Sequence, residues 1–186
     1  MCAALCFNAP LDASNRIIDL DGSLQKSRKT RVIEALVIAA MVFITATIGS
    51  RATIPNIPEW YEGLIKPSFN PPNWIFGPVW TLLYLLMTYA AWRVLGRLNS
   101  RRDHVKIALV FVVQLFSNAL WSIVFFGMHN PAAALFVVIL LEASVIAMIL
   151  AFAKHDRVAA LTQLPYAAWV AFASLLNLAI VLLNPS

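Results

Sequence analysis

The stretch WIFGPVWTLLYLLMTYAAW, residues 74–92, contains no charged side chain. A helix needs about 20 mostly apolar residues, each rising about 1.5 Å, to cross the hydrocarbon core of a membrane. Four further runs are comparably apolar, and Glu142 is the one charge within them: residues 35–50, 107–128, 131–153 and 158–183. The sequence therefore predicts an all-α integral membrane bundle of five transmembrane helices, at residues 32–54, 73–96, 105–128, 131–153 and 158–183.

The composition favours a membrane protein over a soluble one. Of the 186 residues, 61% are hydrophobic, and the mean hydropathy is +0.77. A soluble domain of this size needs more polar surface. Strands of a transmembrane β-barrel alternate apolar and polar residues, whereas these runs are continuous. With no obvious internal repeat, we expect one domain over residues 32–186.

The positive charges are distributed unevenly along the chain, whose net charge is +5. With five crossings, the N-terminal segment and the second and fourth connections share one side of the membrane. The opposite side has only Arg51 and Lys66, and the first side has twelve basic residues: Arg16, Lys26, Arg28, Lys29, Arg31, Arg93, Arg97, Arg101, Arg102, Lys106, Lys154 and Arg157. This asymmetry predicts a cytoplasmic N-terminus and a C-terminus outside. The basic residues are then signals of topology and contacts for anionic lipid, and no nucleic-acid partner is expected.

Residues 1–31 lack a long apolar run and end in the basic sequence KSRKTR. They are predicted to form a disordered extension that anchors the chain at the membrane surface. Cys2 and Cys6 lie in this extension, without the spacing of a zinc site or a CxxC motif. We expect them to remain thiols on the reducing side.

The connection NIPEWYEGLIKPSFNPPN, residues 56–73, is the longest between two predicted helices. Connections of this length in compact proteins are usually functional, although a passive linker is an alternative. Its aromatic residues favour a function, because they suit a solvated tether poorly. Asn73 and Asn130 are predicted to cap the helices that follow them. Pro165 is expected to kink the last helix.

Residues that commonly carry catalysis are scarce in this chain. The three histidines, His104, His129 and His155, lie in or beside predicted connections. No HExxH, GxSxG or glycine-rich phosphate-binding motif occurs. These absences argue against a hydrolase or a metalloenzyme, and no metal site is expected.

Amide and aromatic side chains inside the spans are the strongest candidates for a binding site. Gln114, Asn118 and Trp121 follow i, i+4, i+7 spacing and share one helical face. That face should point into the bundle, because an unpaired amide is costly in hydrocarbon. Either the amides bond neighbouring helices together, or they line a cavity with the indoles. Such a cavity would suit a large planar ligand, since indole offers a flat face and one N–H donor. The full candidate set is Trp80, Tyr84, Gln114, Asn118, Trp121, Trp169 and Asn177.

Glu142 is the only acidic residue within the five apolar runs. A carboxyl group in a membrane is a functional candidate by default. A protonated, hydrogen-bonded structural group is the equal alternative.

Three segments resemble one family in the correct order: WYEGLIKPSFNPPNWIFGPVWTLLYLLM (60–87), QLFSNALWSIVFFG (114–127) and LPYAAWVAFASLLN (164–177). They are similar to the TspO/MBR family of tryptophan-rich sensory proteins and mitochondrial translocator proteins. The likeness covers about residues 33–184.

The resemblance implies a five-helix membrane protein, often a homodimer, that binds porphyrins and other tetrapyrroles. Protoporphyrin IX or haem would be a ligand, and no cofactor would be required. By position, Trp80, Trp169 and Asn118 would contact the ligand. The first connection would form a lid through Trp60, Tyr61, Lys66, Pro67, Asn70, Pro71 and Pro72. Because no histidine lies within a span, we expect metal-free porphyrin to bind without iron.

Three functions follow from the resemblance and from the residues. The leading prediction is tetrapyrrole binding in porphyrin handling, transport or stress sensing. The first alternative is an enzyme that degrades porphyrin with light and oxygen, using Trp80 and Trp169. The second is a small proton-coupled transporter, for which Glu142 would be the protonation site.

Two features depart from the family pattern. The last helix ends in LNLAIVLLNPS, without the tyrosine and following basic residue of the sterol motif, so sterol transport is not expected. Only Ala108 and Ala119 remain of the small-residue pattern that supports the dimer in some bacterial members.

Overall fold

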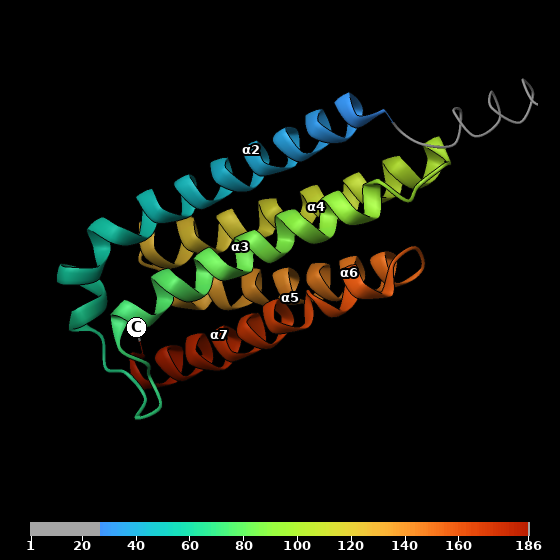
Figure 1. Cartoon of the computed structure of the whole chain (residues 1–186). Coiled ribbons are helices and arrows are strands. Elements are labelled where there is room, and N and C mark those ends of the chain that lie inside the picture. The colour runs from blue at the N-terminus through green and yellow to red at the C-terminus, as the bar shows by residue number, and fades with distance from the viewer. Residues whose placement is uncertain (1–26, 186) are drawn as a thin grey trace, which may run out of the picture.

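The computed structural model describes residues 27–185, and within them it has helices and connections but no strand. Five helical stretches are long and apolar enough to cross a membrane, which confirms the predicted fold class. The first stretch is α2 (Arg28–Thr53), extended by η1 (Ile54–Asn56) and η2 (Ile57–Tyr61). The second is α3 (Asn73–Leu95), and the third is α4 (Arg101–Ser122), extended by η3 (Ile123–Gly127). The fourth is α5 (Pro131–Ala153), and the fifth is α6 (Arg157–Leu161) followed by α7 (Leu164–Leu183). Figure 1 shows these helices as one elongated bundle.

The first helix begins four residues before the predicted position. Residues 1–26 of the predicted extension lie outside the described residues, but Arg28–Arg31 are helical. Arg31 explains this early start. Its guanidinium donates to the Trp92 carbonyl oxygen at 2.8 Å and lies 4.3 Å from the centre of the Trp92 ring, and the Trp92 indole donates to the Arg31 carbonyl oxygen at 3.1 Å. Gly96 leaves room for the guanidinium, because a Cβ at that position would overlap it. These contacts fix the start of α2 against the end of α3.

The connection between α2 and α3 is shorter than predicted. The prolines at 55 and 58 do not end the helix, because each lies in the first turn of a new helical segment, η1 or η2, where a missing N–H costs nothing. Helical backbone continues through Gly63, so the non-helical connection is residues 64–72.

Of the two predicted helix caps, one is confirmed and the other is wrong. Asn130 caps α5 as predicted, since its side-chain oxygen accepts from the Ala133 N–H at 2.9 Å. The predicted cap at Asn73 is wrong: Pro72 precedes the first turn of α3, and the Asn73 amide instead lies 3.5 Å from a Glu62 carboxylate oxygen. Pro165 breaks the last span rather than kinking it, because α6 ends at Leu161 and α7 starts at Leu164.

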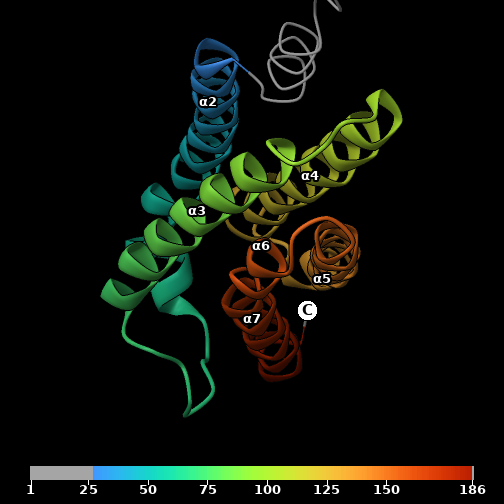
Figure 2. The same cartoon turned by 45° about the vertical axis from the view of Figure 1, so that its right-hand side comes forward.

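The helix α3 packs against only some of the other helices. α4 packs extensively against α5, and α5 against α7, whereas α3 packs mainly on α2 and α6. Figures 1 and 2 show α3 running between α2 on one side and α6 and α7 on the other. We call the end that carries residues 54–73 and 127–131 the loop end, and the end that carries residues 93–106 and 153–157 the basic end. α3 contacts α6 at the basic end, and it meets α7 mainly through side chains, where Phe76 packs on Trp169 and Trp80 on Tyr166.

Candidate functional site

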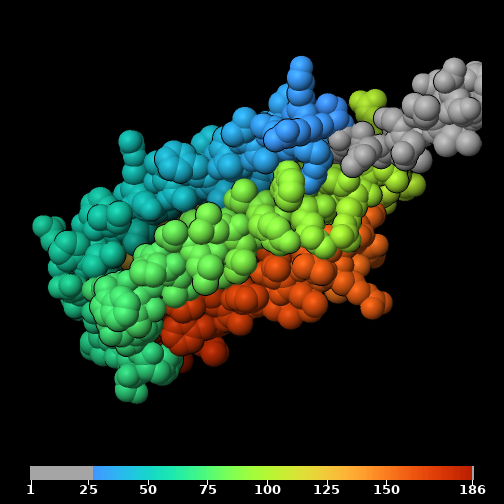
Figure 3. Space-filling model, in the orientation of Figure 1, coloured from blue at the N-terminus to red at the C-terminus, as the bar shows by residue number. Residues whose placement is uncertain are grey.

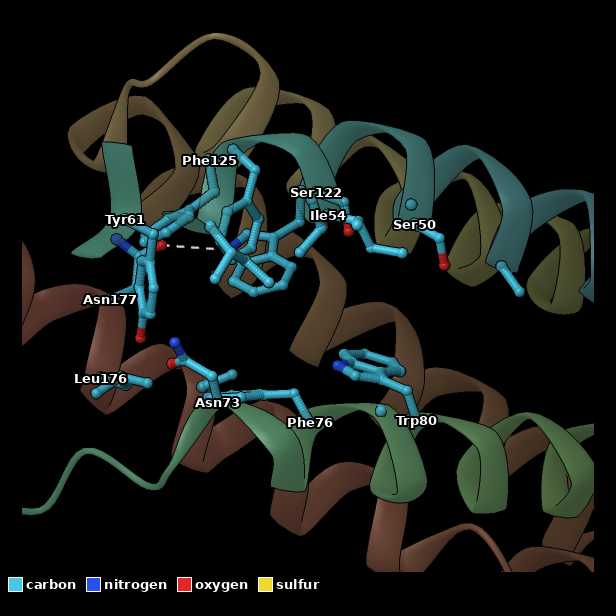
Figure 4. Close-up of a pocket in the computed structure, with 18 of the residues that line it drawn as sticks. Ser50, Ile54, Tyr61, Asn73, Phe76, Trp80, Ser122, Phe125, Leu176 and Asn177 are labelled. Atoms are coloured by element: carbon cyan, nitrogen blue, oxygen red, sulfur yellow. Dashed lines mark hydrogen bonds between the residues drawn. The ribbon is translucent and has the colours of Figure 1, made fainter. Parts of the chain in front are cut away.

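A cavity of about 440 Å³ occupies the loop end of the bundle, between α2, α3, α4 and α7. This volume lies within the range of about 300–1,000 Å³ that is usual for small-molecule sites. Most of the wall is apolar or aromatic, and Figure 4 shows its residues projecting from these helices into a common space. The side chains that give the wall its character are Ser50, Tyr61, Asn73, Trp74, Phe76, Trp80, Tyr84, Trp121, Phe125, Phe126 and Asn177.

The cavity is closed on one side and open on the other. The lining residues of α7 are buried, as are Trp121 and Ser122 of α4. The lining residues Ser50 on α2 and Thr81 on α3 are exposed, and Trp74 is 72% exposed. These exposed residues lie within transmembrane spans. The cavity therefore opens sideways, between α2 and α3, toward the position of the lipid. Figure 3 views the molecule from the face on which α2 and α3 lie together.

Trp80 projects from α3 into the cavity opposite α2, as Figure 4 shows. Its ring centre lies 5.5 Å from that of Tyr84 and 6.2 Å from that of Tyr166, which it meets edge-on. These two rings support the indole from the basic end and leave its other surface on the cavity. Trp80 is thus held in place and presents an aromatic face to an occupant.

Trp121 forms part of the opposite wall from α4. Its indole N–H donates to the Asn177 side-chain oxygen at 3.2 Å, drawn as the dashed line in Figure 4, and the Asn177 amide donates to the Pro131 carbonyl oxygen at 2.8 Å. Phe125 packs 5.5 Å from Trp121 between ring centres. The polar atoms of Trp121 and Asn177 are therefore paired within the protein, and the aromatic surfaces of this wall face the cavity.

A chain of hydrogen bonds lies immediately beyond the cavity on the side of the basic end. The Tyr84 hydroxyl donates to the Asn118 oxygen at 3.0 Å, and the Asn118 amide donates to the Tyr166 oxygen at 3.1 Å. The Tyr166 hydroxyl donates in turn to the Gln114 oxygen at 3.0 Å. Gln114, Asn118 and Tyr166 are at most 1% exposed. The chain joins α3, α4 and α7, so the two amides of α4 bond neighbouring helices together.

Trp169 lies one layer behind the cavity wall. It is not among the lining residues, and its ring centre lies 5.8 Å from that of Phe76, which does line the cavity. On its other side it packs 5.6 Å from Phe172. The seven candidates thus divide into two groups. Trp80, Tyr84, Trp121 and Asn177 line the cavity, while Gln114, Asn118 and Trp169 support it.

The connection at the loop end is fastened to the bundle at two points. The Tyr61 hydroxyl donates to the Asn70 side-chain oxygen at 2.8 Å. Asn184, just past α7, accepts from the Ile65 N–H and donates to the Ile65 carbonyl oxygen, both at 2.9 Å. Lys66 lies 4.9 Å from the centre of the Tyr61 ring. The connection is therefore held across the loop end, and Tyr61 is the member of the predicted lid that reaches the cavity.

The other predicted lid residues lie outside the cavity lining. Trp60 stacks on His129, with ring centres 4.6 Å apart, and the His129 ring pairs with the Asn56 oxygen at 2.8 Å. The three prolines shape the backbone: the carbonyls of Pro67 and Pro71 accept from Asn70, and Pro72 leads into α3.

Glu142 lies in the middle of α5 and does not line the cavity. One of its carboxylate oxygens is buried and has no hydrogen-bond partner among the residues that the structure describes. No group of three metal-ligating side chains comes together within residues 27–185. Among the described residues, no histidine, cysteine or methionine lines the cavity.

Several cavity residues were not predicted. Phe125 follows Trp121 by four positions and therefore shares its face, which is a signal that the sequence contained. Whether Phe76 and Asn73 line the cavity depends on the position of the first turn of α3, which the sequence pattern does not give. Gly49 brings α2 close to α4, because a Cβ there would lie 3.3 Å from the Ser122 hydroxyl oxygen.

Comparison with known proteins places this fold in a family. The sequence profile of the TspO/MBR family matches residues 36–183. The chain belongs to the TspO/MBR family. Residues 36–183 include all the cavity-lining positions, so the site described above lies within the family's common region.

Individual relatives agree with this assignment. The chain is 45% identical over 139 residues to "Tryptophan-rich protein TspO" of Archaeoglobus fulgidus, covering 73% of this chain and 87% of that protein. It is 38% identical over 153 residues to "Protein CrtK" of Rhodobacter capsulatus, covering 81% and 95%. It is 35% identical over 131 residues to the human "Translocator protein", covering 70% and 78%. Together with the five spans, these matches identify an integral multi-pass membrane protein.

Proposed function

We propose that this member of the TspO/MBR family binds a tetrapyrrole, such as protoporphyrin IX, in the cavity at the loop end, and that it acts in porphyrin handling or stress sensing. The observation that carries the proposal is the aromatic cavity of about 440 Å³ that opens toward the lipid between α2 and α3. A tetrapyrrole is large, planar and mostly apolar, and it partitions into membranes. A sideways opening would admit it directly from that phase.

The aromatic wall favours a flat ligand. Trp80 would stack on the ring system, because its face toward the cavity is open while Tyr84 and Tyr166 support its back. Trp121 and Phe125 would meet the macrocycle from the opposite wall. Aromatic pairs of this kind contribute about 0.5–1.5 kcal/mol beyond the area that they bury.

The polar groups near the mouth would meet the acidic edge of the ligand. Asn73 and Ser50 line the cavity and have hydrogen-bonding groups suited to a carboxylate. Arg51 is exposed on the next residue of α2 and would supply a positive charge. Lys66 and Asn70 serve less well in this conformation, because each is engaged around Tyr61. Within residues 27–185 the wall contains no histidine, cysteine or methionine to ligate iron, so we expect binding not to require iron in the porphyrin.

A titration of the detergent-purified chain with metal-free protoporphyrin IX tests the proposal. Binding is followed by the porphyrin absorbance, so that the loss of a fluorescent tryptophan does not change the readout. Trp80→Leu should weaken binding by about 2- to 13-fold, which corresponds to the stacking contribution. Trp169→Leu removes an indole from behind the wall and should weaken it less. Affinity unchanged by Trp80→Leu would remove this cavity as the binding site.

Photo-oxidative degradation of porphyrin remains the second candidate function. It is favoured by the exposure of the Trp80 ring to the cavity, where it would lie against a bound macrocycle. Trp169 is separated from the cavity by Phe76, so the indole chemistry would depend on Trp80. Illumination with and without oxygen tests this function: a defined new absorbing product that Trp80→Phe abolishes would support it, and simple bleaching would not.

A further inference from the structure

A second cavity of about 440 Å³, shallower and more open than the aromatic one, lies at the basic end of the bundle. We call it the Asp156 cavity. It is lined by Arg93 in the last turn of α3, by Arg97 two residues beyond that helix, and by residues 153–158, which run from the end of α5 to the start of α6. We propose that the Asp156 cavity binds the phosphate of an anionic lipid headgroup. The proposal is independent of tetrapyrrole binding.

The charge of the cavity wall suits an anion. Four cationic side chains line it, from Arg93, Arg97, Lys154 and Arg157, against the single carboxylate of Asp156. Three positive charges are therefore left uncompensated. Lys154 and Arg157 are exposed and have no ion-pair or hydrogen-bond partner for their side chains among the described residues. Their charges are available to a ligand.

Asp156 holds the two arginines in position from behind. Its side chain is 0% exposed, and one carboxylate oxygen accepts from the N–H groups of Val158 and Ala159 at 2.9 and 3.2 Å. The other oxygen lies 2.6 Å from Arg93 Nε and 3.0 Å from Arg97 Nε. Asp156 approaches Arg97 only at its Nε atom, so the terminal nitrogens of Arg97 remain for a further acceptor, whereas one terminal nitrogen of Arg93 lies 3.4 Å from the Tyr89 hydroxyl. Guanidinium groups bind phosphate oxygens through such paired donors.

The position of the cavity favours a lipid over a soluble phosphate. It is formed where α3 and α5 end and α6 begins, which is the boundary of three predicted spans. Val158 in its wall is 46% exposed, and Tyr89, one turn before Arg93, is 41% exposed. These apolar surfaces continue from the cavity along the membrane-spanning part of the bundle. A headgroup in the cavity would have its acyl chains beside them, whereas free phosphate would gain nothing from them.

The magnitude follows from the number of charges. A basic side chain near a membrane surface strengthens the attraction to anionic lipid by about fivefold. Removing two of the three uncompensated charges, with Lys154→Gln and Arg157→Gln together, should weaken lipid retention by roughly 20- to 30-fold. Both side chains are exposed, so the fold should tolerate the change. The matched control is Arg101→Gln with Arg102→Gln, which removes two exposed charges from the same end but outside the cavity.

The experiment titrates the full-length chain, in neutral detergent, with phosphatidylglycerol or phosphatidylcholine and counts retained lipid by native mass spectrometry. We expect preferential retention of phosphatidylglycerol, its loss in the Lys154/Arg157 variant and its persistence in the Arg101/Arg102 variant. Equal loss in both variants would show general attraction to a basic surface and would overturn the site. So would equal retention of the two lipids. A parallel titration with inorganic phosphate should not raise the melting temperature. If phosphate raised it and phosphatidylglycerol raised it no further, the lipid assignment would be overturned. Unaltered melting temperatures in phosphatidylcholine confirm that the variants fold.

Discussion

Tyr166→Phe tests whether the chain of hydrogen bonds beside the cavity holds the bundle together. The hydroxyl of Tyr166 donates to Gln114 and accepts from Asn118, and all three residues are buried. Hydrogen bonds between membrane helices contribute about 0.6 kcal/mol on average and up to about 1.7. Loss of two such bonds should therefore lower the free energy of unfolding by about 1–3 kcal/mol. At about 2–4 °C for each kcal/mol, the melting temperature should fall by roughly 2–12 °C.

The assay is thermal unfolding in detergent, followed by circular dichroism, with porphyrin affinity measured on the same samples. Tyr89→Phe is the matched control, because its hydroxyl has one long contact of 3.4 Å with Arg93 and the side chain is 41% exposed. It should change the melting temperature little. Porphyrin affinity should change little in Tyr166→Phe, since Tyr166 does not line the cavity. An undiminished melting temperature would refute the structural role, and a selective loss of affinity would show that the hydroxyl serves the ligand instead.

Three further substitutions test other contacts. Asn184→Ala removes both bonds to Ile65 and should speed amide exchange within residues 64–72 severalfold without unfolding the spans, as hydrogen-exchange mass spectrometry would report. Asp156→Asn removes the carboxylate that two partly exposed arginines share, and should cost about 1–3 kcal/mol in a thermal unfolding assay, below the value for a fully buried pair. Gly96→Val places a side chain where the Arg31 guanidinium lies and should cost about 1–2 kcal/mol through the lost hydrogen bond and cation–π contact; a neutral result in the same assay would contradict that packing.

The five spans could be predicted because hydrocarbon imposes a simple requirement on length and apolarity. Asn130 could be predicted as a cap because it precedes a proline at the first helical position. The end of α2 could not, because the prolines at 55 and 58 are compatible both with a stop and with a new helical segment. The prediction that Asn73 caps α3 failed for a similar reason, because its side chain has a competing partner, Glu62, eleven residues away in sequence.

The sequence could predict which face of α4 points into the bundle, but not at which level along the bundle the cavity lies. Gln114, Asn118 and Trp121 share one face of α4, as their spacing indicated. Nearer the basic end, the rings of α3 and α7 reach Asn118 and close the interior. Trp121, one turn nearer the loop end, lines the cavity instead. Where the cavity forms depends on how α3 packs against α2 and α6, which no local pattern in the sequence specifies. Trp169 shows the same limit, since the placement of Phe76 decides whether it reaches the cavity.

The chain of hydrogen bonds at Tyr166 and the cavity beyond it are made mostly by different residues, and this has a practical consequence. Most residues that fix the architecture differ from those that line the cavity, and the residues with both roles are Tyr84, Trp121 and Asn177. A protein engineer could therefore randomise the rest of the aromatic wall, such as Phe76 and Trp80, to design sites for flat molecules while the scaffold stays intact. The same independence would let natural selection retune the guest in one lineage after another without rebuilding the host.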